Sequence, residues 1–146
     1  MASINGIAHV QLTVSDMQRS IPFYRGLLQA LEMSVLVDTP QFFYCIGGRT
    51  GVAIAPAAAE TKGQPFDQRR VGLHHLCFRA RSREDVDAIH QTAVKLGAKI
   101  VRAPREDQWA PGYYSVLFED PEGIRLEVNH VPGKGLLAAE TPNVRR

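Results

Sequence analysis

Two segments of the sequence, 66 positions apart, share one alternating pattern. Residues 8–14 read AHVQLTV and residues 74–80 read HHLCFRA, which aligns His75 with His9 and Phe78 with Leu12. Alternation of polar and apolar side chains is typical of a β-strand that buries one of its faces. A strand that recurs in this way indicates a duplicated unit, and a duplication restricts the possible folds more than any single motif does.

Each repeated strand is followed by the same series of elements. Apolar residues at intervals of three and four predict one helix over 17–31 and a second over 86–96, with Ser82 and Asp85 as a capping box before the second. Pro22 lies in the first helix, so we expect its regular part to follow the proline. Three strand-like segments come next, 34–37, 42–46 and 52–55 in the first copy and 99–102, 113–118 and 124–129 in the second. The unit is therefore βαβββ, used twice, and the fold class is α+β.

The two copies account for most of the chain. Module 1 covers about residues 5–56, a linker about 57–71, module 2 about 72–131, and a tail 132–146. Neither copy alone has enough apolar residues for a comfortable core, so we expect residues 1–146 to form a single domain of two modules. The tail is expected to be irregular, with at most one short regular segment at 136–140.

Composition excludes several classes of protein. A net charge of +2 over 146 residues is too small to indicate nucleic-acid binding. No apolar run approaches the roughly 20 residues of a membrane span, and the first residues lack the features of a secretion signal. Cys45 and Cys77 show no CxxC spacing and are interpreted as reduced thiols. We therefore expect a cytoplasmic protein that binds neither nucleic acid nor membrane.

Four segments carry a resemblance to a known family. They are 9–14, 20–24, 75–78 and 118–127, and the last, FEDPEGIRLE, is the most specific. Over about residues 5–131 the chain resembles the vicinal oxygen chelate superfamily, also called the glyoxalase/bleomycin resistance protein/dioxygenase family. Its members include glyoxalase I, extradiol dioxygenases, fosfomycin-resistance enzymes and bleomycin-binding proteins. The resemblance implies two βαβββ modules whose curved sheets form a cup, with a metal ion on the concave face.

By motif position, the resemblance implies His9, His75 and Glu127 as metal ligands. Alternation independently places these three side chains on the sheet faces opposite the helices. A single histidine on a strand is more often an ordinary polar residue, but two at equivalent positions of a repeat favour a metal site. Two imidazoles and one carboxylate suit Fe(II) and also tolerate Mn, Ni, Co or Zn, so we expect one divalent ion per site. Glu127 is in addition the candidate catalytic residue, with a tyrosine as the other candidate base.

Weaker candidates surround this trio. Gln11, Asn129 and either Tyr113 or Tyr114 are candidate substrate-orienting groups, although solvated polar residues would look the same. Trp109 lies between Pro- and Gly-containing segments and is a candidate lid over the pocket or simply a packing residue. Three arginines are candidates for receiving an anionic substrate, and three further histidines are interpreted as structural; they are Arg79, Arg102 and Arg125, and His74, His90 and His130.

One carboxylate of the glyoxalase I pattern is missing. That pattern has a Glu on the last strand of the first module, where residues 51–56 here read GVAIAP, with Ala53 or Ile54 in its place. The difference argues against lactoylglutathione lyase activity. The fosfomycin-modifying enzymes do use a His, His, Glu trio, but the loop expected from them is replaced by residues 106–112. Typical extradiol dioxygenases are about twice as long as this chain.

The sequence thus predicts a small metal-dependent enzyme whose divalent ion chelates two neighbouring oxygens of a small-molecule substrate. Isomerase, lyase or transferase chemistry and dioxygenase chemistry both stay open. The alternative is a non-catalytic protein that binds a drug-like molecule, as the bleomycin-resistance proteins do. We also expect a homodimer with two equivalent sites, and in one arrangement His9 comes from one chain and His75 with Glu127 from the other.

Overall fold

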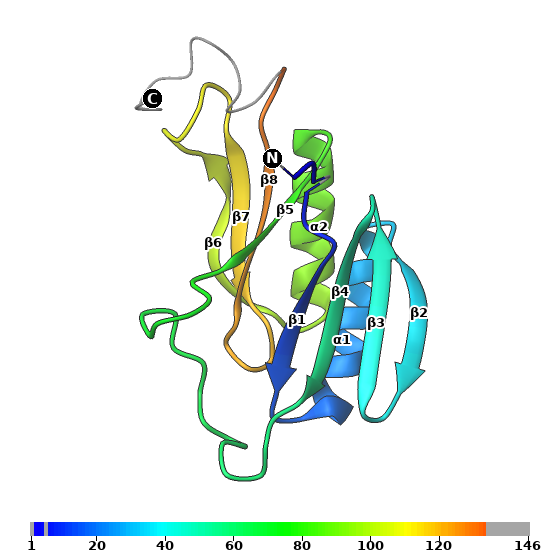
Figure 1. Cartoon of the computed structure of the whole chain (residues 1–146). Coiled ribbons are helices and arrows are strands. Elements are labelled where there is room, and N and C mark those ends of the chain that lie inside the picture. The colour runs from blue at the N-terminus through cyan, green and yellow to red at the C-terminus, as the bar shows by residue number, and fades with distance from the viewer. Residues whose placement is uncertain (1, 5, 134–146) are drawn as a thin grey trace. The chain divides into compact units, whose positions relative to one another are not determined.

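The computed structural model describes residues 2–4 and 6–133, so the regular segment expected at 136–140 lies outside the described residues. The chain divides into two compact units, residues 1–66 and residues 67–146. Each unit has one open four-stranded sheet and one helix (Figure 1). The predicted α+β fold with two βαβββ modules is therefore confirmed. Among the described residues, no helix is both long and apolar enough to cross a membrane.

The first unit begins with the strand that carries His9. Its elements are β1 (His9–Val14), α1 (Met17–Ala30), β2 (Ser34–Thr39), β3 (Phe42–Gly47) and β4 (Thr50–Pro56). The strand order is β1-β4-β3-β2, with β1 parallel to β4 and the other pairs antiparallel. Helix α1 packs on one face of this sheet (Figure 1), and the core between them includes the fully buried Val14, Tyr24, Leu27, Leu28, Phe43 and Ile54.

The second unit repeats the same topology. Its elements are β5 (Leu76–Arg79), α2 (Arg83–Lys95), β6 (Lys99–Glu106), β7 (Tyr114–Glu119) and β8 (Arg125–His130), in the order β5-β8-β7-β6. The predicted capping box is present, because the Asp85 N–H donates to Ser82 Oγ and the Ser82 N–H donates to the Asp85 carboxylate. The core under α2 includes Val86, Ile89, Ala93, Phe118, Leu126 and Val128.

Helix α1 contradicts the expectation that its regular part follows Pro22. It begins at Met17, where the Asp16 carboxylate accepts a hydrogen bond from the Arg19 N–H at 3.1 Å, and it continues through the proline. Proline has no N–H, so residue 22 cannot donate the helical hydrogen bond to the carbonyl of Gln18. Gln18 is an exposed residue of the first turn. Burial of the apolar residues that follow, beginning with Phe23, outweighs this loss.

Strand β6 is longer than the segment 99–102 that we expected. It continues to Glu106 and includes Pro104. A proline is tolerated there because β6 is the edge strand of its sheet, and only one of its sides must supply hydrogen bonds. Its pairing with β7 shifts register twice, between Ile100 and Arg102 and between Arg102 and Arg105. Neither the extension nor the shifts follow from polar and apolar alternation.

In both units the helix covers one sheet face, and the predicted ligands lie on the other face. Along β1, Leu12 and Val14 are buried under α1, whereas His9, Gln11 and Thr13 are exposed.

The segment between β4 and β5 has no helix or strand. Its first part is attached to unit 1, because the Gly63 N–H donates a hydrogen bond to Ser15 Oγ at 2.8 Å.

Candidate functional site

Glu127 lies at the centre of a group of polar side chains in unit 2. It occupies the middle of β8, next to Cys77 of β5 and Leu117 of β7, and it is only 8% exposed. The Tyr113 hydroxyl donates a hydrogen bond to Glu127 Oε1 at 2.8 Å, and Arg102 Nη2 lies 3.6 Å from the same oxygen. A carboxylate can remain buried when it is paired in this way.

His75 approaches the other oxygen of this carboxylate. It directly precedes β5, its side chain is 38% exposed, and its Nε2 lies 3.3 Å from Glu127 Oε2. Its Nδ1 lies 2.8 Å from Nδ1 of His74, so one of these two nitrogens donates and the other accepts. His74, which the sequence indicates to be structural or partly exposed, is exposed, and its ring contacts the His75 ring.

The separation of these two atoms fits a shared ion. Two donor atoms bound to one divalent metal at about 2.0–2.2 Å, at tetrahedral or octahedral angles, lie roughly 2.8–3.6 Å apart. The 3.3 Å between His75 Nε2 and Glu127 Oε2 falls in this range. Within residues 2–4 and 6–133 there is no group of three or more His, Cys, Asp or Glu side chains that could hold a metal ion. His75 and Glu127 are two side chains of the ligand types that such an ion uses.

His9, the third predicted ligand, belongs to unit 1. It is the first residue of β1, is exposed, and pairs in parallel register with Gly51 of β4. Gln11, two residues further along, is also exposed and pairs with Ala53. Both side chains lie on the sheet face opposite α1, as alternation predicted.

The strand register identifies the residue that replaces the missing carboxylate. In the 66-residue repeat Cys77 corresponds to Gln11; Cys77 pairs with Glu127, and Gln11 pairs with Ala53. Ala53 therefore stands in unit 1 where Glu127 stands in unit 2. Ile54, the other candidate, is fully buried on the helix side. Unit 1 thus has no carboxylate at this position.

Of the two tyrosines left open by the sequence, Tyr113 reaches Glu127. Burial, followed by the hydrogen bond and charge of Glu127, raises the pKa of its hydroxyl well above the usual value, although Asn129 hydrogen-bonds to the same phenol and acts in the opposite direction. Tyr114 lies on the helix side, where its hydroxyl donates to Asp87 Oδ1 at 2.8 Å and the Arg83 guanidinium lies 4.8 Å from its ring centre. Of the candidate substrate-orienting groups, Tyr113 therefore contacts the carboxylate, and Asn129 contacts Tyr113.

Arg102 has partners that sequence analysis missed. Its guanidinium donates to Ser115 Oγ at 2.8 Å and to the Ser115 carbonyl at 3.2 Å, beside Glu127, and its side chain is only 17% exposed. The contact depends on the register shifts in β6, so no sequence signal could have identified it. Arg125, another candidate for anion binding, pairs instead with Glu119 at 3.0 Å.

Cys77 and Trp109 lie nearer the surface. The Cys77 thiol stays protonated at neutral pH, because desolvation and the Glu127 carboxylate raise its pKa to about 12. Both Cys45 and Cys77 are unpaired. Trp109 lies in the connection between β6 and β7 with 64% of its surface exposed, and its role as a lid stays a prediction.

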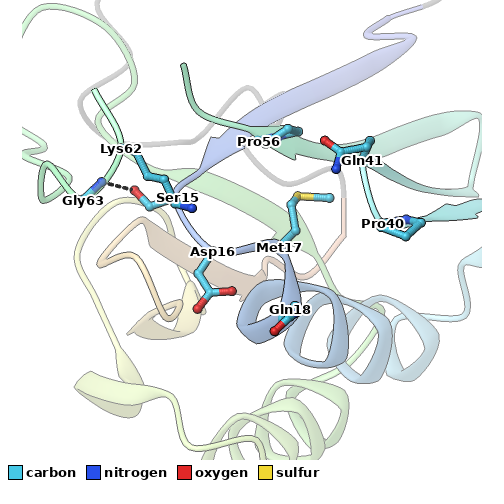
Figure 2. Close-up of a pocket in the computed structure, with 9 residues that line it drawn as sticks. All are labelled: Ser15, Asp16, Met17, Gln18, Pro40, Gln41, Pro56, Lys62 and Gly63. Carbon is cyan, nitrogen blue, oxygen red and sulfur yellow. Dashed lines mark hydrogen bonds between the residues drawn. The ribbon is translucent and has the colours of Figure 1, made fainter. Parts of the chain in front are cut away.

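A separate pocket of about 610 Å³ lies in unit 1, at the opposite end of β1 from His9. Its walls come from the β1–α1 connection, the β2–β3 turn and the segment after β4, and Figure 2 shows Lys62 and Gln41 on opposite sides of Met17. The lining residues are Ser15, Asp16, Met17, Gln18, Pro40, Gln41, Pro56, Lys62 and Gly63. None of the predicted site residues lines this pocket.

Comparison with known proteins assigns a family. The model of the Glyoxalase/Bleomycin resistance protein/Dioxygenase superfamily matches residues 6–128. A metallothiol transferase FosB from Shouchella clausii is 27% identical over 129 residues, which are 86% of this chain and 80% of the relative.

Solved structures agree with this assignment. A candidate glyoxalase from Bacillus halodurans has a TM-score of 0.74 and 28% identity, and the match covers 85% of this chain and 94% of that one. A glyoxylase/bleomycin resistance protein/dioxygenase domain from Frankia sp. EAN1pec has a TM-score of 0.70 and 26% identity, with 88% and 98% covered. The residues matched by the family model run from before β1 into β8, so the chain belongs to the glyoxalase/bleomycin resistance protein/dioxygenase superfamily.

Proposed function

We propose that the protein is a metal-dependent enzyme in which His9, His75 and Glu127 hold one divalent ion and a small substrate binds that ion through two neighbouring oxygens. The observation that carries this proposal is the 3.3 Å separation of His75 Nε2 and Glu127 Oε2. The other carboxylate oxygen is held by Tyr113, which leaves Oε2 as the donor atom beside the imidazole.

The role of His9 rests on the repeat and on the family. His9 occupies in unit 1 the position that His75 occupies in unit 2, and it is exposed on the face opposite α1. Three protein ligands leave further positions of the ion for substrate oxygens. We propose that the two units act together as one domain, either within one chain or across a homodimer.

The chain's own residues supply charge and hydrogen bonds around these ligands. A bound divalent ion would supply Lewis-acid stabilisation of negative charge that develops on a substrate oxygen. The positive charge of Arg102 offsets the negative charge of Glu127. The site with a bound divalent ion would then keep a net positive charge, which favours an anionic chelating substrate. Tyr113 donates its hydroxyl hydrogen to Glu127 and so acts as a hydrogen-bond donor rather than as the base. Glu127 is therefore the candidate catalytic residue.

Within this chemistry we favour group transfer or addition over isomerisation. An isomerase of the glyoxalase I type moves a proton with the help of a first-module carboxylate, and Ala53 stands at that position here. The FosB relative is a transferase by name, and its similarity spans both units. Oxygen chemistry is the second branch, because a site with two histidines and one carboxylate also suits Fe(II).

The test is metal binding by the purified chain. We expect calorimetry with Mn, Fe, Co, Ni or Zn to give close to one ion per chain, and we expect His75→Ala or Glu127→Ala to abolish stoichiometric binding. His90→Ala, a histidine of α2 outside the site, is the matched control and should bind as the wild type does. Wild-type protein that binds none of these metals would contradict the enzyme proposal and favour a non-catalytic binding protein.

The reaction branch is then tested with the loaded protein. We expect thiol addition to an anionic electrophile such as fosfomycin to exceed lactoylglutathione formation. Oxygen uptake by the Fe(II)-loaded protein with a panel of catechols would favour the dioxygenase branch instead. Strong lactoylglutathione formation would show that another residue replaces the carboxylate missing at Ala53.

A further inference from the structure

Gly51 leaves room for a tyrosine ring next to His9. Gly51 of β4 pairs with His9 of β1, and a Cβ placed on Gly51 would collide with the hydroxyl oxygen and two ring carbons of Tyr44. Tyr44 of β3 pairs with Ala53 of β4, two residues from Gly51. The Tyr44 ring is therefore tilted along the strand direction, from Ala53 toward Gly51. A glycine is required at position 51 because the Tyr44 ring fills the space that any side chain there would occupy.

The Tyr44 ring lies on the same face of the sheet as His9. Side chains of paired residues on neighbouring strands point to the same face, so the missing Cβ of Gly51 points to the face that carries the exposed His9 side chain. Neighbouring strands are about 4.8 Å apart. The Tyr44 hydroxyl therefore lies roughly one strand spacing from the base of the His9 side chain, within reach of a small ligand held at the imidazole.

The position of this hydroxyl is fixed by packing. Phe42, two residues before Tyr44 on β3, lies with its ring centre 6.2 Å from that of Tyr44. The Tyr44 side chain is half-buried, and in the part of the chain that the structure describes no hydrogen bond is made by its hydroxyl. Phenylalanine would fill the same space, so packing alone does not require the oxygen atom.

The two units differ at the corresponding positions. Leu117 pairs with Glu127 as Tyr44 pairs with Ala53, so unit 2 has an aliphatic side chain where unit 1 has a phenol. Tyr113 in unit 2 already donates its hydroxyl hydrogen to Glu127. Tyr44 therefore lies beside His9, a predicted metal ligand, and its hydroxyl hydrogen is available to a bound molecule.

We propose that Tyr44 contacts the substrate and donates a hydrogen bond to one of its oxygens. The proposal rests on the proposed function, because it places the substrate at the ion that His9 helps to hold. It also narrows the substrate class. A phenol that donates favours a substrate oxygen that accepts, such as an oxygen of a carboxylate, phosphonate or enolate, over a neutral hydroxyl.

The test compares metal binding with ligand binding in the full chain. Oxalate, an anion with two neighbouring oxygens, is titrated calorimetrically into Co(II)-loaded protein, with metal-free protein as the blank. We expect Tyr44→Phe to keep the Co(II) stoichiometry and thermal midpoint of the wild type and to bind oxalate about tenfold more weakly, since a hydrogen bond to a charged group is lost. Tyr114→Phe, which removes a phenol on the helix side, is the matched control and should keep wild-type oxalate affinity.

A second variant does not depend on Tyr44 itself. Gly51→Ala displaces the Tyr44 ring, so we expect it to retain Co(II) and to lose oxalate affinity to a similar extent. If both variants bind oxalate within twofold of the wild type, the role of Tyr44 is wrong while the proposed function stands. If wild-type protein binds no Co(II), or binds oxalate no better when loaded, the proposed function itself fails and the role of Tyr44 fails with it.

Discussion

The two oxygens of Glu127 have different partners. Oε1 accepts a hydrogen bond from Tyr113 and lies near the Arg102 guanidinium, whereas Oε2 faces His75. One oxygen is thus held by the protein and the other is directed toward a candidate co-ligand. Groups that hold a metal ligand in place strongly affect metal affinity even when they do not touch the ion. Tyr113 is therefore a positioning residue for Glu127.

Tyr113→Phe removes this hydrogen bond and keeps the ring. We expect calorimetry to give a metal dissociation constant about 10- to 100-fold larger than that of the wild type, because the carboxylate is less well oriented. We expect the free energy of unfolding to fall by about 1–3 kcal/mol, because a buried carboxylate oxygen loses its hydrogen bond. Tyr114→Phe removes the exposed bond to Asp87 instead, so it should lower stability less and leave metal affinity unchanged. Equal metal affinities of the two variants would contradict the positioning role.

Alternation of polar and apolar residues predicted which side chains share a sheet face, but not which atoms are in contact. It correctly placed His9 and Gln11 opposite α1, and it placed Glu127 between two residues that pack under α2. The contact between His74 and His75 depends on side-chain rotamers, and the contact of Arg102 with Ser115 depends on irregular pairing. A sequence pattern of period two carries neither kind of information.

Pro22 in α1 and Pro104 in β6 separate the features that the sequence could predict from those that it could not. The repeat and its periodicities predicted by type each helix and strand of residues 2–4 and 6–133. The expectation that the regular helix begins after Pro22 was wrong, and the strand expected over 99–102 continues through Pro104 to Glu106. Tertiary packing of α1 and the edge position of β6 override the local preference, and neither is visible before the topology is known.

Pro22→Ala tests how much α1 loses to its proline. We expect the free energy of unfolding in urea to rise by about 1–3 kcal/mol, because alanine restores the N–H that can bond the Gln18 carbonyl and relieves the ring clash. Pro40→Ala, in the exposed turn between β2 and β3, is the control and should lower stability slightly through the more flexible unfolded chain. A loss of stability in Pro22→Ala would show that the proline ring itself contributes to packing.

The proposed ligand set includes residues from both units. His9 lies in residues 1–66, and His75 and Glu127 lie in residues 67–146. Such a set can be completed within one chain or across the two-fold axis of a homodimer. In a two-fold interface every contact between the chains occurs twice. We expect a homodimer by light scattering at micromolar concentration.

Mixing two defective variants distinguishes the two arrangements. In a heterodimer of His9→Ala and His75→Ala chains, a site shared between chains is restored once, because the intact His9 of one chain meets the intact His75 of the other. A site within one chain is never restored, since each chain lacks one ligand. If chains exchange freely, half of the dimers are mixed and each holds one of two sites, so metal binding should return to about a quarter of the wild-type stoichiometry. Mixed dimers, verified by a mass tag, that bind no metal would place all three ligands in one chain.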